Sequence, residues 1–353
     1  MSATDFHPLR VSQVQPEGDD ALVLAFEVPE IWRHVYAFEP GQYLTLRHGD
    51  ERRSYSICAA AGEAPRVGVR KVPGGVFSNW LHSHAKSGLT LQVMPPQGRF
   101  GSALQPLLQQ SPRHVLAVAG GSGITPILSI IKTVLARSAK SRVTLLYGNR
   151  RAATTMFKEE LEDLKNRYLT RFVLHAVFSR EVMDSALHAG RLDAQKIHTL
   201  LRLSGPVDQA FICGPHAMND DAERALLAAG LQQQQIHVER FGLPPDQASA
   251  VTAAQPGDAS TATITVVRDG LAREVPYGPQ DSSILAAATR AGLDMPFSCR
   301  SGVCATCRAK LLHGQVRMDR NFALEKDELA AGFVLSCQSH PTTERVTLSF
   351  DER

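Results

Sequence analysis

The chain has 353 residues, of which 43% are hydrophobic and 21% charged, a composition typical of a globular protein with two or three domains. Its formal net charge is only +3, so charge gives no reason to expect nucleic acid or a membrane surface as a partner. The N-terminal segment lacks the apolar stretch of a signal peptide. Residues 114–131, the most apolar stretch, are interrupted by glycines and a proline and are too short to span a bilayer. We expect a cytoplasmic protein.

Residues 1–108 contain short β-prone segments separated by turn residues, with few helical periods. This pattern predicts an antiparallel barrel or sandwich. The expected strands are Ala21–Val28, Gln42–Leu46, Val67–Val72 and Thr90–Met94, and the expected helix is Val76–His84.

Residues 109–241 alternate between strands and helices, which predicts βαβ units around a parallel sheet. The expected strands are His114–Ala119, Arg142–Tyr147, Phe172–Phe178 and Ala210–Cys213, and the expected helices are Ile124–Ala136, Phe157–Tyr168, Asp193–Leu203 and Ala217–Ala229. The pattern ends at residue 241, so we expect an α/β domain there.

Residues 242–261 are rich in Ala, Pro, Ser, Asp and Gly without any period, which predicts a linker. Residues 262–353 then form a third module. Its expected strands are Thr263–Val267, Arg273–Val275, Val334–Ser336 and Val346–Phe350, and its expected helix is Ile284–Ala291.

Four of the six cysteines have a spacing that is typical of an iron–sulfur site. Cys299 and Cys304 are separated by four residues, Cys307 follows after two more, and Cys337 follows after a further 29. Plant-type 2Fe–2S ferredoxins have this spacing, with four thiolates around two irons. Structural zinc and free thiols are the alternatives. Zinc usually takes its cysteines from two C-x2-C pairs, and this chain has one such pair, so the sequence favours a 2Fe–2S cluster.

Residues 262–353 resemble a plant-type ferredoxin domain of α+β, β-grasp fold. The resemblance implies that Cys299 and Cys304 hold one iron, and that Cys307 and Cys337 hold the other. Free ferredoxins are strongly acidic carriers, whereas this segment has 11 acidic and 11 basic residues. A ferredoxin that is tethered to its reductase has less need of a charged docking face, so the difference favours a fusion.

Two motifs in the first module contain the residue types that a flavin site needs. Arg53-Ser54-Tyr55-Ser56 offers a cation for a pyrophosphate, an aromatic plane and small hydrogen-bond donors, although a tyrosine in a strand is more often a core residue. Pro73-Gly74-Gly75-Val76-Phe77-Ser78 places two glycines before a helix, whose first N–H groups can bind an anion. An ordinary Gly-Gly turn is the alternative for this second motif.

The α/β module contains three further motifs. Gly120-Gly121-Ser122-Gly123-Ile124-Thr125-Pro126 lies between a strand and a helix, where a dinucleotide pyrophosphate binds. Cys213-Gly214-Pro215 ends a later strand, and ligands of open parallel sheets bind beyond such strand ends. Glu239-Arg240-Phe241 ends the module. The alternatives are a buried hydrophobic cysteine and a terminal strand that simply packs into the core.

In this order the motifs resemble those of the ferredoxin–NADP reductase superfamily. The resemblance implies an antiparallel flavin-binding β-barrel, with Arg53 and the amides of Gly75–Ser78 at the phosphates, Tyr55 against the ring and Ser56 near flavin N5. It also implies that Cys213 lies against the nicotinamide and that Glu239 and Phe241 lie at the hydride-transfer face. We expect Ser56, Cys213 and Glu239 to be catalytic. The expected cofactor-binding residues are Arg53, Tyr55, Ser56, Lys71, Gly74, Gly75, Val76, Phe77, Ser78, Gly121, Gly123, Thr125, Arg150, Arg151, Cys213, Gly214, Pro215 and Phe241.

Five segments together are similar to the reductase subunits of phenylacetyl-CoA epoxidase complexes: LYGNR (146–150), ICGPHAMNDDAE (212–223), HVERF (237–241), CRSGVCATC (299–307) and DELAAGFVLSCQ (327–338). This similarity implies FAD rather than FMN, and electron delivery through the 2Fe–2S cluster to a multicomponent diiron oxygenase. One alternative is a reductase with the same cofactors that serves a Rieske or steroid oxygenase. Another is a non-redox interaction protein held together by zinc.

Arg150 and Arg151 follow the second strand of the α/β module, and no acidic residue occurs before Glu159. In dinucleotide-binding folds an acidic residue at this place favours the free 2′-OH of NADH, whereas arginine accommodates the 2′-phosphate of NADPH. We therefore expect NADPH to be preferred over NADH. The alternative is that the two arginines are simply solvated.

Overall fold

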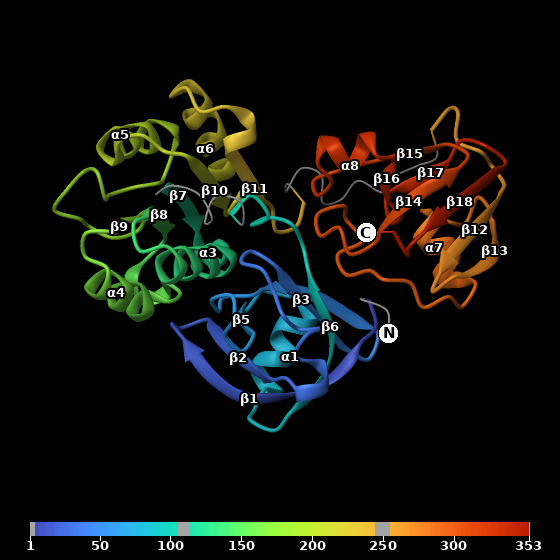
Figure 1. Cartoon of the computed structure of the whole chain (residues 1–353), viewed down its shortest axis with the longest axis horizontal. Coiled ribbons are helices and arrows are strands. Elements are labelled where there is room, and N and C mark those ends of the chain that lie inside the picture. The colour runs from blue at the N-terminus through green and yellow to red at the C-terminus, as the bar shows by residue number, and fades with distance from the viewer. Residues whose placement is uncertain (1–3, 105–112, 244–254, 353) are drawn as a thin grey trace. The chain divides into compact units, whose positions relative to one another are not determined.

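The computed structural model describes residues 4–104, 113–243 and 255–352 (Figure 1). They form two compact units. The larger unit contains residues 6–241, and the smaller contains the residues from Gly242 onward together with Thr4 and Asp5. None of the described helices is long and apolar enough to cross a membrane.

The larger unit begins with a six-stranded antiparallel sheet in the order β4-β3-β6-β1-β2-β5. A bridge between Ile57 and Val67 joins the two edges of this sheet, so the sheet curls into the expected barrel. β1 is amphipathic, since Leu9 and Val11 are buried while Arg10 between them is exposed. The elements are β1 (His7–Glu17), β2 (Ala21–Glu27), β3 (Tyr43–His48), β4 (Glu51–Ser56), β5 (Arg66–Arg70), α1 (Val76–His84) and β6 (Thr90–Gln97).

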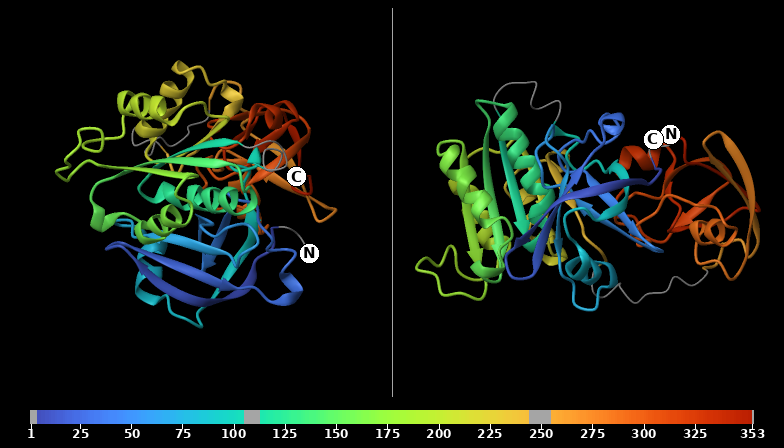
Figure 2. Two further views of the ribbon diagram at one scale, coloured as in Figure 1. Left: turned by 60° about the vertical axis from the view of Figure 1, so that its left-hand side comes forward. Right: turned by 90° about the horizontal axis from the view of Figure 1, so that it is seen from below.

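The second part of this unit is the expected parallel sheet, in the order β11-β10-β7-β8-β9. Every residue of the central strand β7 is buried, because α3 and α4 cover one face of the sheet while α5 and α6 cover the other (Figures 1 and 2). The elements are β7 (His114–Gly120), α3 (Ile124–Arg137), β8 (Arg142–Asn149), α4 (Lys158–Arg167), β9 (Phe172–Phe178), α5 (Ala194–Ser204), β10 (Gln209–Cys213), α6 (His216–Ala228) and β11 (Ile236–Glu239).

The strand order reverses beside β7, since β8 pairs with one side of it and β10 with the other. The loops that follow β7 and β10 therefore lead to helices on opposite faces of the sheet. This topological switch point is where open parallel sheets bind their ligands.

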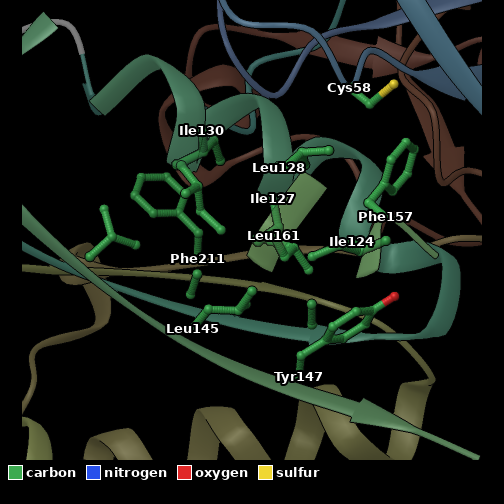
Figure 3. Packing of buried hydrophobic residues seen from close by; sticks show 14 of the residues in the cluster. Cys58, Ile124, Ile127, Leu128, Ile130, Leu145, Tyr147, Phe157, Leu161 and Phe211 are labelled. Atoms are coloured by element: carbon green, nitrogen blue, oxygen red, sulfur yellow. The ribbon is translucent and has the colours of Figure 1, made fainter. Parts of the chain in front are cut away.

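A shared hydrophobic core joins the barrel to the α/β sheet. Figure 3 shows Ile124, Ile127 and Leu128 of α3 between the sheet residues and Cys58 of the barrel. Gly68 in β5 lies so close to the α/β part that a Cβ atom there would be 2.8 Å from Cγ2 of Thr125. The two parts therefore pack as one body. The expected boundary between them, at residues 108 and 109, lies outside the described residues.

The smaller unit has a five-stranded mixed sheet in the order β13-β12-β18-β14-β16, with α7 packed against it around a separate core. This is the ferredoxin-like α+β fold expected from the sequence. A second, two-stranded sheet pairs β15 with β17. The elements are β12 (Ala262–Arg268), β13 (Leu271–Tyr277), α7 (Ile284–Arg290), β14 (Arg308–His313), β15 (Val316–Met318), α8 (Lys326–Ala330), β16 (Phe333–Leu335), β17 (Ser339–Pro341) and β18 (Arg345–Ser349).

The last part of the predicted linker is attached to the smaller unit. The carboxylate of Asp258 accepts hydrogen bonds from Nε of Arg317 at 2.8 Å and from Nη2 at 2.7 Å. The next residue, Ala259, donates its N–H to the carbonyl of Pro341 at 2.8 Å. These hydrogen bonds to Arg317 lower the pKa of Asp258 to about 2. Residues 244–254 of the predicted linker lie outside the described residues.

We predict that Asp258→Asn lowers the free energy of unfolding of the smaller unit by about 1–3 kcal/mol at pH 7, because the bidentate ion pair is lost. Since folding lowers this pKa from 3.8 to about 2, the contribution is complete above pH 3.8 and is lost as pH falls through 2. Calorimetry of the full chain measures the change, with Glu274→Gln on the exposed face of β13 as control. Equal stability of the two variants would contradict the prediction.

Candidate functional site

A cavity of about 950 Å³ lies in the larger unit at the switch point of the parallel sheet. The loops after three strands line it, through Gly120–Gly123, Gly148–Arg150 and Gly214–Pro215. The barrel contributes Arg70–Pro73 and Asn79, and Phe241 lies at the end of the α/β part. The barrel and the parallel sheet therefore share one cavity, with room for a cofactor between them.

The loops at the carboxyl ends of β7 and β10 approach so closely that only glycine fits. A Cβ atom on Gly123 would lie 2.1 Å from the carbonyl oxygen of Cys213, and one on Gly214 would lie 3.0 Å from the backbone N of Gly120. Gly121 has a left-handed backbone with φ of +55°. Gly121 and Gly123 lie directly before α3, whose first backbone N–H groups suit a dinucleotide pyrophosphate.

The three residues expected to be catalytic come together from three strands. Cys213 at the end of β10 and Glu239 at the end of β11 are direct register partners. Ser56 at the end of β4 donates its hydroxyl to Oε2 of Glu239 at 3.4 Å. A barrel residue and a sheet residue that are far apart in the sequence thus meet at one carboxyl group.

The environment of Glu239 disfavours its charge. The residue as a whole is partly exposed, but the protein surrounds its carboxyl group, and this burial raises the pKa of Glu239 to about 8 despite the hydrogen bond from Ser56. Burial also raises the pKa of Cys213 well above its usual value, and a charge on Glu239 adds to that effect. At neutral pH both groups therefore carry protons.

The residues expected at the flavin lie along β4 and at the start of α1. Tyr55 is half-buried and stacks on Phe77, with ring centroids 6.2 Å apart. Arg53 is exposed and forms an ion pair with Glu51 at 2.9 Å. The N-cap residue of α1 is Gly75, and no side chain forms a capping hydrogen bond there. The first N–H groups of this helix are therefore available to an anion. Gly74 is exposed with φ of +73°, and a Cβ atom there would meet nothing within 4 Å.

The other residues expected to bind cofactors differ in their exposure and in their contact with the cavity. Phe77 is only 2% exposed, so its backbone rather than its ring is available to a ligand. Thr125 is also buried, and its hydroxyl donates to the carbonyl of Ser122 at 3.0 Å, which closes the turn before α3. Arg150 and Lys71 line the cavity, whereas Arg151 does not.

Three residues that were not predicted from the sequence also line the cavity: Arg70, Ser179 and Arg191. Arg70 is held by Asp20, with Nε 3.0 Å from Oδ1, and by the carbonyl of Thr154, 2.5 Å from its Nη2. Its Nη1 would be 3.0 Å from a Cβ atom on Gly121, so this cation lies directly beside the glycine turn. No local motif marks these residues, because only the packing of the barrel brings Arg70 there.

The four clustered cysteines of the smaller unit interact in two pairs. A hydrogen bond with Cys304 lowers the pKa of Cys299 to about 5, and one with Cys307 lowers the pKa of Cys337. Among the described residues, no three His, Cys, Asp or Glu side chains are arranged to hold a single metal ion. These are the pairs that the ferredoxin resemblance assigns to the two irons.

Known proteins match this arrangement throughout the chain. Residues 117–224 match the oxidoreductase NAD-binding domain, and residues 266–342, which contain all four clustered cysteines, match the 2Fe-2S iron-sulfur cluster binding domain. A subunit of 1,2-phenylacetyl-CoA epoxidase from Escherichia coli K12 is 45% identical over an alignment of 362 positions, which covers 99% of each chain. The chain belongs to the family of ferredoxin reductase components of oxygenase systems. It is an oxidoreductase.

A second curated relative supports this family, and a solved structure shows the same fold. The ferredoxin reductase component of 3-ketosteroid-9-alpha-monooxygenase from Mycobacterium tuberculosis (strain CDC 1551 / Oshkosh) is 37% identical, over 98% of this chain and 96% of the relative. The solved structure of phthalate dioxygenase reductase covers 98% of both chains with a TM-score of 0.59 and 23% identity, so it has the same fold.

We predict that Cys304→Ser removes the visible absorption of the 2Fe–2S cluster but leaves the flavin bound, because the cysteines and the flavin residues belong to separate units. Reduction of ferricyanide by nicotinamide nucleotide should persist, while electron delivery to an oxygenase should fail. Absorption spectra and the two assays measure this. Loss of flavin from the same variant would show that the two units do not fold independently.

Proposed function

We propose that the chain is the reductase component of a phenylacetyl-CoA epoxidase, passing electrons from NADPH through FAD and a 2Fe–2S cluster to a diiron oxygenase. The observation that carries the proposal is the meeting of Ser56, Cys213 and Glu239 where the barrel packs on the parallel sheet. Gly214, the residue after Cys213, lines the cavity that these two parts share. The 45% identity to the Escherichia coli protein, a component of 1,2-phenylacetyl-CoA epoxidase, supports this oxygenase as the partner. The cytoplasmic location expected from the sequence remains a prediction.

The residues of the barrel fit a flavin. Tyr55 offers a ring that already packs on Phe77, and the uncapped N-terminus of α1 offers N–H groups for the phosphates. Arg53 and Lys71 add positive charge. A bound flavin supplies the chemistry that accepts a hydride and releases electrons singly, while the protein positions it and adjusts its surroundings.

The proposed role of Glu239 is to keep a neutral, proton-bearing carboxyl group beside the hydride path. Ser56 fixes the orientation of this carboxyl group, and Cys213 fills the space next to it with an uncharged thiol. Because the surroundings disfavour charge, the site holds a proton at neutral pH without adding a negative charge next to an incoming hydride.

We predict that the limiting rate of flavin reduction falls as pH rises through about 8, because Glu239 then loses its proton. Glu239→Gln should lose this pH dependence, since an amide does not ionise, and should be slower than the native protein because an amide carries no acidic proton. Cys213→Ala should also slow reduction more than it weakens nucleotide binding. Rapid mixing under anaerobic conditions gives both quantities. Native-like rates in both variants would leave these residues with a purely structural role.

NADPH is the proposed nucleotide, since Arg150 lines the cavity after β8 where a 2′-phosphate is recognised. The planar guanidinium group suits phosphate because it donates two parallel hydrogen bonds. Arg70 beside the Gly121 turn supplies a second cation, which supports a role at the pyrophosphate.

We predict that Arg150→Glu raises the Michaelis constant for NADPH by about tenfold or more, roughly 1.4 kcal/mol, and changes that for NADH little. Arg151→Glu is the matched control, because Arg151 carries the same charge but does not line the cavity. Steady-state kinetics with both nucleotides measures the effect. An equal change for both nucleotides, or a native protein that prefers NADH, would contradict the proposal.

A second candidate function keeps the same cofactors but serves a steroid oxygenase. The 37% identity to the reductase component of 3-ketosteroid-9-alpha-monooxygenase supports it. The two functions are separated by mixing the reduced protein with each purified oxygenase and measuring product. Turnover of phenylacetyl-CoA but not of a steroid supports the epoxidase, and the reverse result supports the alternative.

A further inference from the structure

The end of β11 places Glu239 at the edge of the parallel sheet. β11 is an edge strand, and Glu239 is its last residue. The strand pairs only with β10, through Cys213 opposite Glu239. The carbonyl oxygen of Glu239 accepts a hydrogen bond from a side chain outside the sheet.

That donor is Asn219, the fourth residue of α6. Its Nδ2 donates to the carbonyl of Glu239 at 3.2 Å, and its own backbone N–H is bonded to the carbonyl of Pro215 at 3.0 Å. Asn219 is 0% exposed, so no water replaces this hydrogen bond. The side chain thus links the loop after β10 to the end of β11.

The other end of this amide has no partner. Oδ1 of Asn219 is buried and accepts no hydrogen bond from the described residues. A buried acceptor without a donor costs about 1–3 kcal/mol, which an apolar side chain at this position would avoid. Packing alone therefore does not explain an asparagine here, whereas the carbonyl that faces its Nδ2 does.

We propose that Asn219 is a positioning residue for hydride transfer, which acts by holding the Glu239 backbone so that the carboxyl group meets Ser56. This inference rests on the proposed role of Glu239. The hydrogen bond from Asn219 acts only on the Glu239 carbonyl group, because a different residue holds the side chain of Arg240. Arg240 pairs with Asp220 at 2.8 Å, and that carboxylate is 56% exposed.

Removal of the amide frees the end of β11. The Glu239 carboxyl group then gains access to water and loses its fixed distance to Ser56. A more hydrated carboxyl group ionises at lower pH. The fall in flavin-reduction rate with rising pH, called the pH limb below, therefore moves down from about 8. A residue that served only stability would lower the melting temperature without moving this limb.

The test uses the full, FAD-loaded chain in anaerobic rapid mixing with NADPH. Asn219→Ala should slow limiting flavin reduction at least tenfold, shift the limb to lower pH and leave the half-saturating NADPH concentration within about twofold. Asp220→Ala is the matched control from the same turn of α6, and it should keep the native rate and limb. Unchanged rate and limb in a folded Asn219→Ala variant would overturn the proposal.

Asn219→Asp provides a second variant if alanine prevents folding, because aspartate has the same shape but presents an oxygen to the carbonyl once ionised. Its rate should therefore fall at a lower pH than that of the native protein, and a native rate and pH dependence in this variant would count against the proposal. Glu239→Gln separates the two hypotheses. If it is slow while Asn219→Ala is native-like, only the positioning role fails, and if it is native-like, the proposed role of Glu239 fails.

Discussion

The packing of the barrel against the α/β sheet is the contact on which the candidate site depends, since Ser56 comes from one part and Cys213 and Glu239 come from the other. Polar links reinforce the shared apolar core. Nη2 of Arg66 in β5 lies 2.9 and 3.1 Å from the two carboxylate oxygens of Glu160 in α4, which gives a partly buried, geometrically favourable ion pair. Lys132 of α3 joins the same carboxylate and Glu63 of the barrel, each at 2.9 Å.

A further polar contact between the barrel and the α/β part stabilises an unusual backbone conformation at Phe157. Phe157 has a left-handed conformation with φ of +57°, which a bulky residue rarely adopts. Its N–H donates to Oε1 of Glu17 in β1 at 2.6 Å, so a barrel carboxylate stabilises the turn before α4. The ring of Phe157 is buried against the position of Gly68. Steric fit and charge together therefore hold the two parts in one body, as a direct transfer between two bound cofactors requires.

Local sequence patterns predicted the elements whose side chains alternate or repeat in a simple way. α1 covers the expected residues 76–84, and β7 is an unbroken apolar strand before a glycine turn. The cysteine spacing predicted the iron–sulfur domain, because ligand geometry restricts sequence separation directly. β1 and β4 escaped prediction as strands, since one contains two prolines and the other, Glu51–Ser56, has only one aromatic residue among polar ones.

Contacts made only by the folded chain were beyond sequence reasoning. Arg70 lies beside Gly121 because β5 packs against the α/β part, and Asn219 reaches Glu239 because α6 crosses the end of β11. The attachment of Asp258 to Arg317 likewise has no local signature in a segment that has the composition of a linker. Each of these residues acts through tertiary neighbours rather than through a motif.

The central claim is that one chain carries a flavin and a 2Fe–2S cluster that are reduced by the same nucleotide. An anaerobic reductive titration with NADPH, followed by visible absorption and electron paramagnetic resonance, tests it most directly. The account predicts uptake of two electrons by one FAD and of one electron by one cluster in each chain, with the cluster signal appearing only when the flavin is present. A chain that binds zinc in place of iron, or whose cluster stays oxidised while the flavin is fully reduced, would contradict it.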